Sequence, residues 1–205
     1  MNKGKFIVFE GTDGSGKSTH ARILTEKLMA SGIDTYVTFE PTSYETGKLL
    51  RRFLSGEISG DERTVAALFM ADRMEHLFDP EDGIIAHLEK GITVICDRYY
   101  LSSVAYNCHS ENIDWVLSIN ARAKQTLMPD LTIFLDAPIE RTEKRTANRV
   151  AKEIYEKNDV QQRVRERYYE AFAKLTDENI AIISTDRERQ LVSDDIWQKA
   201  QELFN

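Results

Sequence analysis

The stretch EGTDGSGKST, residues 10–19, follows the apolar run FIVF and constrains the fold more than any other part of the sequence. Its spacing fits the pattern G-x-x-x-x-G-K-[ST], in which glycines let backbone N–H groups point at phosphate oxygens. In this pattern Lys17 reaches the outer phosphates, and the hydroxyl of Ser18 can bind Mg²⁺. The sequence therefore predicts a phosphate-binding loop, formed by Gly11, Thr12, Asp13, Gly14, Ser15, Gly16, Lys17, Ser18 and Thr19.

The residues on either side of this loop provide the context that the pattern needs. KFIVFE is typical of a short buried strand, and ARILTEKLMASG is typical of an amphipathic helix that Gly32 closes. The amino end of that helix would direct its positive dipole end at the bound anion. A glycine-rich turn that matches by chance is the alternative, and the strand–loop–helix order disfavours it.

Apolar segments alternate with helical patterns along the rest of the chain. Asp61 can cap a helix that ends at Asp79-Pro80, where the proline would start a further helix closed by Gly91. Strands that alternate with helices predict an α/β fold, a parallel sheet with helices on both faces. The five expected strands are Phe6–Glu10, Thr35–Phe39, Thr93–Cys96, Leu131–Leu135 and Ile180–Ser184.

Length and charge narrow the class of protein. The 205 residues favour one domain, 1–205, and the net charge of −7 argues against a nucleic-acid coat, which would need a basic surface. No apolar stretch reaches the length of a membrane span, and the first residues lack a signal-peptide core. Two cysteines, Cys96 and Cys108, and four scattered histidines predict no disulfide framework or metal cluster. We therefore expect a cytoplasmic enzyme.

Ligands of open α/β sheets bind beyond the carboxyl ends of the strands, which points to Asp13, Glu40, Asp97, Arg98 and Asp136. An acid directly after a buried strand, here Asp97, is where phosphate-loop proteins place a magnesium-binding carboxylate. Arg98 follows at once, and a guanidinium grips phosphate with two hydrogen bonds. A second substrate that carries phosphate is therefore favoured over simple nucleotide hydrolysis. A surface ion pair of Asp97 and Arg98 is the alternative.

Six stretches together point to a family: FIVFEGTDGSGKST, FEPT followed by GKLLRRFL, ALFMADRMEH, VICDRYYLSSVAYN, PDLTIFLD and VRERYYEAF. In this order and spacing they resemble thymidylate kinases, over essentially the whole chain. The resemblance implies transfer of the γ-phosphate of ATP to dTMP, with Mg²⁺, in the synthesis of dTTP. It also implies the nucleoside-monophosphate-kinase fold, with a five-stranded parallel sheet and a mobile lid, usually in a homodimer.

The resemblance further implies roles for the phosphate-binding and metal-binding residues. Asp13 would reach toward the dTMP sugar and its phosphate, and Arg51 and Arg98 would hold that phosphate. Asp97 and Ser18 would bind Mg²⁺. By resemblance the whole dTMP site consists of Asp13, Arg51, Phe69, Arg73, Arg98, Ser102, Ser103, Tyr106 and Asn107.

The base-reading residues of this set are also supported by their spacing. Phe69 and Arg73 are one helical turn apart and share a face, so a flat ring and a donor could meet a pyrimidine together. By resemblance Phe69 stacks on thymine, Arg73 bonds its exocyclic oxygen, and Tyr106 packs against the deoxyribose, where a 2′-hydroxyl would be crowded. A core role for Phe69 is the alternative. Many family members have glutamine at the position of Asn107.

The expected lid, about residues 141–157, departs from the common bacterial pattern of the family. Arg141, Arg145 and Arg149 recur every four residues, which places them on one face of a helix. Some relatives carry an arginine where this phosphate loop has Gly14, so we hypothesise that Arg145 or Arg149 contacts the γ-phosphoryl group instead. A solvated charged face is the alternative. The catalytic set is then Lys17, Asp13, Arg98, Asp97, Arg145 and Arg149.

Other functions compatible with the phosphate loop stay open from the sequence. One is a kinase of another deoxynucleoside monophosphate or of a deoxynucleoside, although a nucleoside acceptor would need a carboxylate base and fewer phosphate-gripping arginines. Another is a phosphate-loop regulatory ATPase that binds a protein partner. It would hydrolyse ATP slowly and without dependence on an acceptor.

Overall fold

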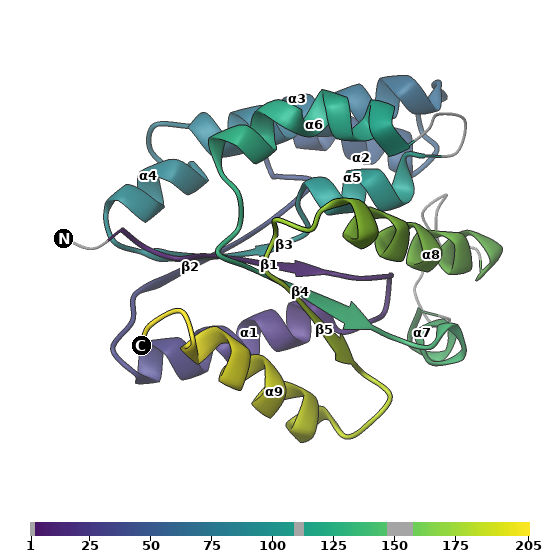
Figure 1. Cartoon of the computed structure of the whole chain (residues 1–205). Coiled ribbons are helices and arrows are strands. Elements are labelled where there is room, and N and C mark those ends of the chain that lie inside the picture. Colours follow the sequence, from purple (N-terminus) through teal and green to yellow (C-terminus); the bar gives the residue numbers. More distant parts are fainter. Residues whose placement is uncertain (1–2, 109–112, 147–157) are drawn as a thin grey trace.

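The computed structural model describes residues 3–108, 113–146 and 158–205, apart from the side chains of residues 143–146 and 158–159. In these ranges five parallel strands form one sheet in the order β2-β3-β1-β4-β5 (Figure 1). The predicted α/β fold with a five-stranded parallel sheet is confirmed. The strands are β1 (Phe6–Glu10), β2 (Thr35–Phe39), β3 (Thr93–Asp97), β4 (Leu131–Asp136) and β5 (Ile180–Ser184).

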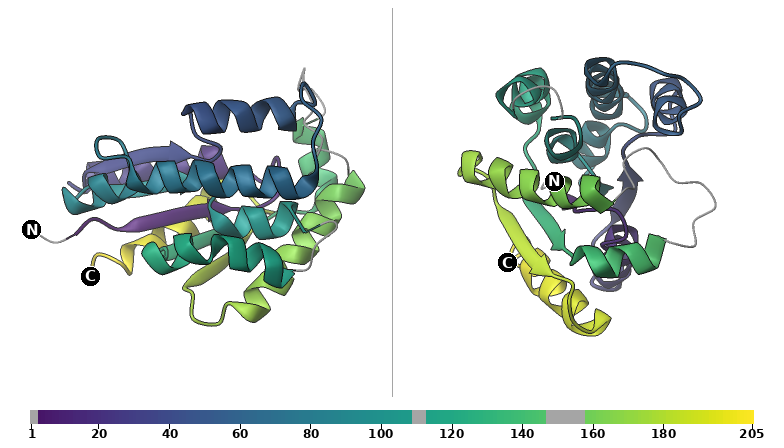
Figure 2. Two further views of the ribbon diagram at one scale, coloured as in Figure 1. Left: turned by 90° about the horizontal axis from the view of Figure 1, so that it is seen from above. Right: turned by 90° about the vertical axis from the view of Figure 1, so that its right-hand side faces the viewer.

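Helices cover both faces of the sheet, as two views of the ribbon show (Figures 1 and 2). One face carries α1 (Lys17–Ala30) and α9 (Arg189–Gln201). Another helix, α7 (Ile139–Thr146), follows β4. The opposite face carries α2 (Glu45–Leu54), α3 (Glu62–Phe78), α4 (Ile84–Glu89), α5 (Tyr100–Tyr106), α6 (Ile113–Thr126) and α8 (Asn158–Lys174).

The central strand β1 is buried on both sides. Phe6 and Val8 belong to the hydrophobic cluster under α2 to α8, whereas Ile7 and Phe9 belong to the cluster under α1 and α9. Successive side chains of a strand point to opposite faces, so a strand between two helical layers needs an apolar residue at every position. The continuous apolar run of this strand follows from that requirement.

The strand order brings two loops side by side at the carboxyl edge of the sheet. β1 lies between β3 and β4, with Phe9 opposite Asp97 and Glu10 opposite Phe134. The residues that follow β1 and those that follow β3 therefore leave the sheet as neighbours. This arrangement positions the phosphate loop next to Arg98.

The helix ends agree with most of the capping signals in the sequence. The carboxylate of Asp61 accepts the backbone N–H of Arg63 at 2.9 Å, so Asp61 caps α3 as predicted. Gly32 and Gly91 follow the ends of α1 and α4 with φ angles of 80° and 81°. Both adopt the left-handed conformation that commonly ends a helix.

The predicted helix start at Pro80 is wrong. The next helix, α4, begins at Ile84 after a turn. Asp79 explains this difference, because its carboxylate accepts the N–H groups of Glu81 (3.0 Å) and Asp82 (2.8 Å). Such local side-chain bonds compete with a helix and favour a turn.

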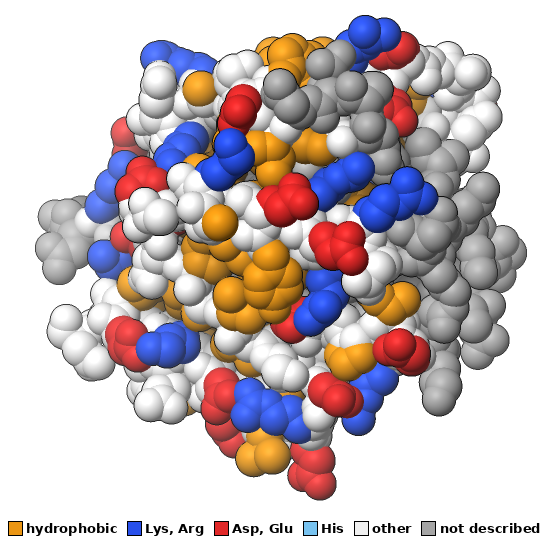
Figure 3. All heavy atoms as spheres, turned by 45° about the vertical axis from the view of Figure 1, so that its right-hand side comes forward, with side chains coloured by type: hydrophobic (Ala, Val, Ile, Leu, Met, Phe, Trp, Pro, Cys, Tyr) orange, Lys and Arg blue, Asp and Glu red, His pale blue; other side chains and the backbone are white. Residues whose placement is uncertain are grey.

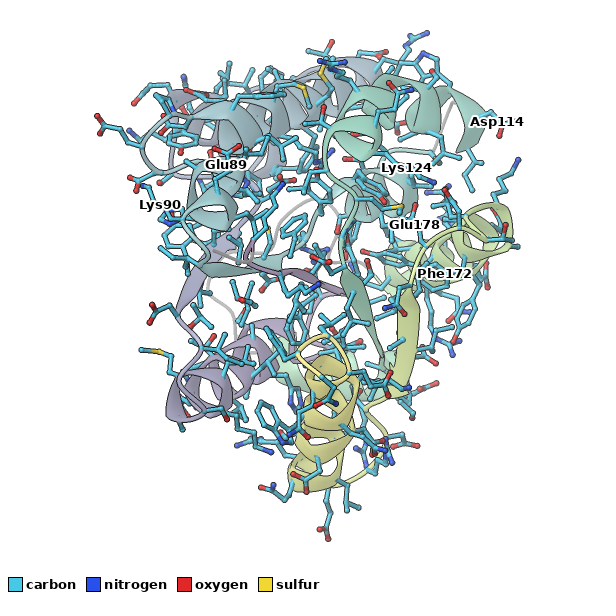
Figure 4. All side chains as sticks on the ribbon, turned by 60° about the vertical axis from the view of Figure 1, so that its left-hand side comes forward. Glu89, Lys90, Asp114, Lys124, Phe172 and Glu178 are labelled. Carbon is cyan, nitrogen blue, oxygen red and sulfur yellow. The ribbon has the colours of Figure 1, made fainter. Side chains whose placement is uncertain are left out.

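Helix α8 is fixed between α6 and the sheet. Lys124 of α6 donates a hydrogen bond of 2.9 Å to Asp177, and its Nζ lies 3.1 Å from an oxygen of Glu178, just after α8 (Figure 4). The ring of Phe172 packs edge-on against Phe134 of β4, with 5.0 Å between their centroids. These contacts fix the carboxyl end of α8 against α6 and β4.

The surface carries a mixture of charges. Acidic and basic side chains are interspersed over the face seen in Figure 3. Of the helices in the described ranges, none combines the length and the apolar character needed to cross a membrane.

Candidate active site

The phosphate loop joins β1 to α1 in the predicted strand–loop–helix order, and glycines shape it. Gly11 has a φ of 146°, and a Cβ added there would lie 2.7 Å from the carbonyl oxygen of Leu135 and 2.8 Å from Ser15 Oγ. Gly16, at the N-cap of α1, has a φ of 103°. Residues with side chains rarely adopt these conformations, so the loop requires glycine at both positions.

Lys17 is the first residue of α1, and its side chain folds back over the loop. Its Nζ donates to the carbonyl oxygens of Gly11 (3.1 Å) and Thr12 (3.0 Å). Burial, followed by the charge of Arg98, lowers the pKa of Lys17 to about 8, although Asp97 opposes this shift. An anion nearby would favour the protonated lysine. The position therefore suits a phosphate ligand.

Ser18 and Asp97 form a pair at the mouth of the loop. Ser18 Oγ donates to Asp97 Oδ2 at 2.7 Å. The second oxygen, Oδ1, is buried and has no hydrogen-bond partner among the residues that the structure describes. Buried polar atoms are normally satisfied, and carboxylate and hydroxyl oxygens are ligands that Mg²⁺ prefers. The pair fits a magnesium site.

Arg98 has a strained backbone, and its guanidinium makes several hydrogen bonds. Within the described ranges it is the one non-glycine residue with a left-handed backbone, at φ 75°. Such conformations cost on the order of 1–3 kcal/mol and cluster at functional sites. Its guanidinium donates to Asp13 Oδ1 (2.6 Å), to Ser102 Oγ (3.1 Å) and to the hydroxyl of Tyr106 (3.3 Å). Its neighbours thus fix the direction in which Arg98 points.

Asp13 carries the negative charge opposite Arg98. Burial alone would raise the pKa of Asp13, but Arg98 and Lys17 outweigh it and hold the pKa below its ordinary value. The hydroxyl of Tyr106 donates to Asp13 Oδ2 at 3.2 Å. Asp13 is therefore ionised at neutral pH and partners Arg98 across the loop.

Two cavities meet at Asp13 and Arg98. The larger has a volume of about 860 Å³ and extends from the phosphate loop and Asp97 to residues after β5. The smaller has a volume of about 60 Å³. Its lining consists of Asp13, Pro41, Leu54, Phe69, Arg98, Ser102 and Tyr106. Ligands bound in the two cavities would face each other at the pair Asp13–Arg98.

The smaller cavity gathers five of the residues predicted for the substrate site. Arg51 lies next to it, because its guanidinium donates to the carbonyl oxygens of Pro41 (2.5 Å) and Thr42 (2.6 Å). The five that line it are Asp13, Phe69, Arg98, Ser102 and Tyr106. Residues from four separate segments of the sequence therefore converge here.

Arg73 and Ser103 do not line this cavity. Arg73 is 1% exposed and sits in a buried polar cluster, where it donates to Glu40 (2.9 Å), Ser103 (3.1 Å) and Asn120. Asn107 is buried as well and forms the C-cap of α5. These three predicted residues thus lie in the layer behind the cavity wall.

Sequence reasoning missed one wall of the larger cavity. Thr185, Arg187 and Arg189 follow β5 and line this cavity. The rule that ligands bind beyond strand ends could have found them, since they follow the fifth strand directly. Their signal in the sequence was the stretch STDRER, residues 184–189.

Asp136 and Arg141, which the sequence also singled out, do not line the two cavities. Asp136, at the end of β4, is held by two hydrogen bonds from Arg165, at 2.6 and 2.9 Å, and does not line either cavity. Arg141 of α7 pairs with Asp186 at 2.8 Å. Arg149 and the side chain of Arg145 lie outside the described residues.

The sequence of this chain is similar to those of known proteins. The family described as thymidylate kinase matches residues 9–196. The chain is 42% identical over 165 residues to a probable thymidylate kinase of Methanococcus aeolicus, covering 80% of this chain and 77% of the relative. A probable thymidylate kinase of Pyrococcus abyssi is 40% identical over 173 residues, covering 81% and 82%.

A solved structure agrees with these relatives. The thymidylate kinase of Candida albicans superposes with a TM-score of 0.77 and 26% identity, covering 98% of this chain and 92% of that one. The family match extends over nearly the whole sequence, and the likeness in fold extends over nearly the whole structure. The chain therefore belongs to the thymidylate kinase family of phosphotransferases.

Proposed function

We propose that this chain transfers the γ-phosphoryl group of ATP to dTMP, giving dTDP and ADP for dTTP synthesis, at the junction of the two cavities. The observation that carries the proposal is that both cavities share Asp13 and Arg98. A donor phosphate chain in the larger cavity and an acceptor phosphate in the smaller one would meet there. Holding two reacting groups in such proximity accounts for a large part of phosphoryl-transfer catalysis.

The donor half of the site is the phosphate loop with its helix. Backbone N–H groups of residues 11–19 would cradle the phosphates of ATP, and Lys17 would neutralise their outer charge. Arg187 and Arg189 line the same cavity. Guanidinium groups stack on aromatic rings, so these two arginines suit the nucleoside part of ATP.

Mg²⁺ would be held by Ser18 and Asp97. The buried oxygen of Asp97 that lacks a partner within the described ranges supports this assignment. When bound, the ion neutralises charge on the phosphates. The protein itself contributes the orientation of the two ligands through their mutual hydrogen bond.

The acceptor half is the smaller cavity and the residues behind it. Arg98 and Arg51 would hold the dTMP phosphate, Phe69 would stack on thymine, and Tyr106 would pack against the deoxyribose. By resemblance Arg73 would bond the base, which requires it to exchange one of its buried partners Glu40, Ser103 and Asn120. Ser102 lines the cavity, and Ser103 and Asn107 lie in the layer behind its wall.

The remaining elements of the proposal concern the whole chain. Residues 1–205 form one kinase domain in which about residues 141–157 act as a lid, and Arg145 or Arg149 contacts the γ-phosphoryl group. The enzyme works in the cytoplasm as a homodimer. The arginine spacing supports the lid contact, the family match over residues 9–196 supports a single domain, and the location and the homodimer rest on the resemblance to the family.

One assay tests the proposed function. ATP consumption is measured alone and with dTMP, dUMP, dCMP or thymidine as acceptor. We expect dependence on dTMP. Dependence on another monophosphate or on thymidine would assign a different acceptor, and acceptor-independent hydrolysis would favour a regulatory ATPase. The dUMP arm has a specific reason, since the Candida albicans structure is described as revealing the origin of broad substrate specificity.

A further inference from the structure

Gln161 lies in the first turn of α8 and is bonded twice to Asp13 of the phosphate loop. The backbone N–H of Asp13 donates to Gln161 Oε1 at 2.9 Å, and Gln161 Nε2 donates to Asp13 Oδ2 at 3.0 Å. The side chain is 4% exposed. An N–H needs an acceptor and a carboxylate needs a donor, so the orientation of this amide is determined by its two partners.

The same face of α8 is anchored at a second point of the strand–loop unit. Tyr168, two turns after Gln161, is fully buried, and its hydroxyl donates to Glu10 at 2.7 Å. That hydroxyl also lies 3.0 Å from the hydroxyl of Ser102. Residues seven apart share a helix face, so α8 clamps the chain at Glu10 and at Asp13 together.

Arg98 depends on Asp13 for its direction, and Asp13 depends on Gln161. One carboxylate oxygen of Asp13 accepts from Arg98 at 2.6 Å. The other oxygen accepts from Tyr106 and Gln161, at 3.2 and 3.0 Å. Loss of the amide would leave the backbone N–H of Asp13 without its acceptor and the second oxygen with Tyr106 alone, and the carboxylate could rotate.

We propose that Gln161 is a positioning residue, which holds the Asp13 carboxylate so that Arg98 is aimed at the acceptor phosphate. This inference rests on the proposed function, because it assigns Gln161 to the acceptor side of that site. A neutral amide is required at this position, since it must donate to a carboxylate and accept from an N–H at once. The titratable groups that its amide contacts are Asp13 and Tyr106, and Arg98 in turn bonds to both of these.

The test compares three variants with the wild-type chain at about pH 6 and about pH 8, because burial and a neighbouring carboxylate both raise the pKa of a carboxyl. Gln161→Glu keeps an acceptor for the backbone N–H of Asp13 but places a second carboxylate against the carboxylate of Asp13. Gln161→Met keeps the length and loses both bonds. Gln162→Glu is the matched control, because Gln162 is exposed on the same helix and its side chain donates to Glu166 at 2.8 Å.

We expect Gln161→Glu to lower kcat/KM for dTMP about tenfold or more at the higher pH, as misplacement of a positioning contact does. At the lower pH a larger share of the new carboxyl carries a proton that it can donate to Asp13, so the deficit relative to wild type should shrink to about threefold. Gln161→Met should lose a similar factor at both pH values. Gln162→Glu should stay within about twofold throughout, and KM for ATP should change little in all variants.

A pH-independent deficit in Gln161→Glu, or near-wild-type kcat/KM for dTMP in Gln161→Met, would overturn the positioning role. An equal rise in KM for ATP would do the same. Circular dichroism at both pH values checks folding, and Gln161→Met decides the question if Gln161→Glu unfolds. Failure of the proposed function is distinguishable, because then the wild-type chain itself would show no dTMP-dependent ATP consumption.

Discussion

Ser18 and Asp97 lie 79 residues apart in the sequence and are joined by a hydrogen bond of 2.7 Å. Their proximity follows from the pairing of β1 with β3, which places the phosphate loop beside the end of the third strand. The bond orients the carboxylate of Asp97, whose other oxygen is buried. The pairing of the strands thus brings Ser18 of the phosphate loop and Asp97 together as one candidate metal site.

Removal of the Asp97 charge should weaken magnesium use. Asp97→Asn preserves the shape but removes the anionic ligand, so we expect kcat to fall about 10²-fold at fixed Mg²⁺ and to need a higher free Mg²⁺ concentration. The measurement is kcat as a function of free Mg²⁺, with chelation as the zero point. Asp194→Asn, an exposed change on α9, is the control. An unaltered Mg²⁺ dependence in Asp97→Asn would remove this residue from the metal site.

Lys17→Ala should abolish turnover and leave the fold intact. The lysine neutralises phosphate charge as the transition state forms, and electrostatic contacts of this kind are typically worth ~10²-fold or more. The measurements are kcat for dTMP phosphorylation and a circular dichroism spectrum. A variant that keeps more than about a tenth of the wild-type rate would contradict the role of Lys17 in the phosphate loop.

Affinity for ATP should depend on pH through the same lysine. The pKa of Lys17 in the free protein is about 8, below its ordinary value of 10.5, and a bound anion would raise it. ATP binding should therefore be insensitive to this group below about pH 8 and weaken above it, by up to tenfold per pH unit. For the stability of the fold the pH dependence has the opposite sign. The pKa of Lys17 is higher in the unfolded chain than in the folded one, so the contribution of Lys17 to the free energy of unfolding rises with pH from about 8.

Calorimetry of ATP binding at several pH values, in buffers that differ in ionisation enthalpy, would measure the proton taken up. Uptake should appear above about pH 8 and be absent from Lys17→Met. Proton uptake of equal size in that variant would assign the titration to another group. The nearby Asp13 does not interfere, because its pKa is held below its ordinary value.

Phe69→Ala should separate base stacking from core packing. Stacking of a base on an aromatic ring is worth about 1–3 kcal/mol, so KM for dTMP should rise about tenfold or more while KM for ATP stays nearly constant. Leu68→Ala is the matched control, because Leu68 packs against the same hydrophobic cluster and does not line the cavity. A drop in melting temperature with both KM values intact would support the alternative core role for Phe69.

The strands were predicted almost to the residue. The inner strands β1, β3 and β4 are apolar runs buried between two helical layers, whereas the edge strands β2 and β5 are partly exposed. β3 and β4 extend one residue further than predicted, to Asp97 and Asp136, since Phe9 and Ser184 pair with these two acids. The start of α4 was missed because two side-chain bonds from Asp79 form a turn that residue propensities do not reveal.

The site was predictable where local sequence defines it and not where it depends on distant partners. The conformation of the phosphate loop follows from its own glycines. The burial of Arg73 depends on Glu40 and Asn120, and the setting of Asp13 depends on Gln161, 148 residues away. A single sequence gives no sign of such pairings, because they exist only after the strands and helices have packed.

Arg145→Ala and Arg149→Ala should test whether one of these arginines contacts the γ-phosphoryl group. The phosphate loop has Gly14 where some relatives carry an arginine, so the positive charge has to come from elsewhere. An arginine that contacts the transferring group can contribute ~10³-fold or more to turnover. We expect at least one variant to lose about 10²-fold in kcat while dTMP affinity barely changes. Arg141→Ala is the control, since that guanidinium pairs with Asp186. Near-normal kcat in both variants would return these two arginines to a surface role.

The strand order has a consequence for how this protein could change over evolution. β2 and β3 lie on one side of β1, and β4 and β5 lie on the other. Apart from Asp13, the lining of the smaller cavity comes from residues 41–106, whereas one wall of the larger cavity comes from residues 185–192. Under the proposed function, the residues that would contact the acceptor base and those that would contact the donor nucleoside therefore lie in separate stretches, 41–106 and 185–192, whereas both cavities share Asp13 and Arg98. Each stretch can diverge, or be exchanged with a relative, while the other is inherited intact.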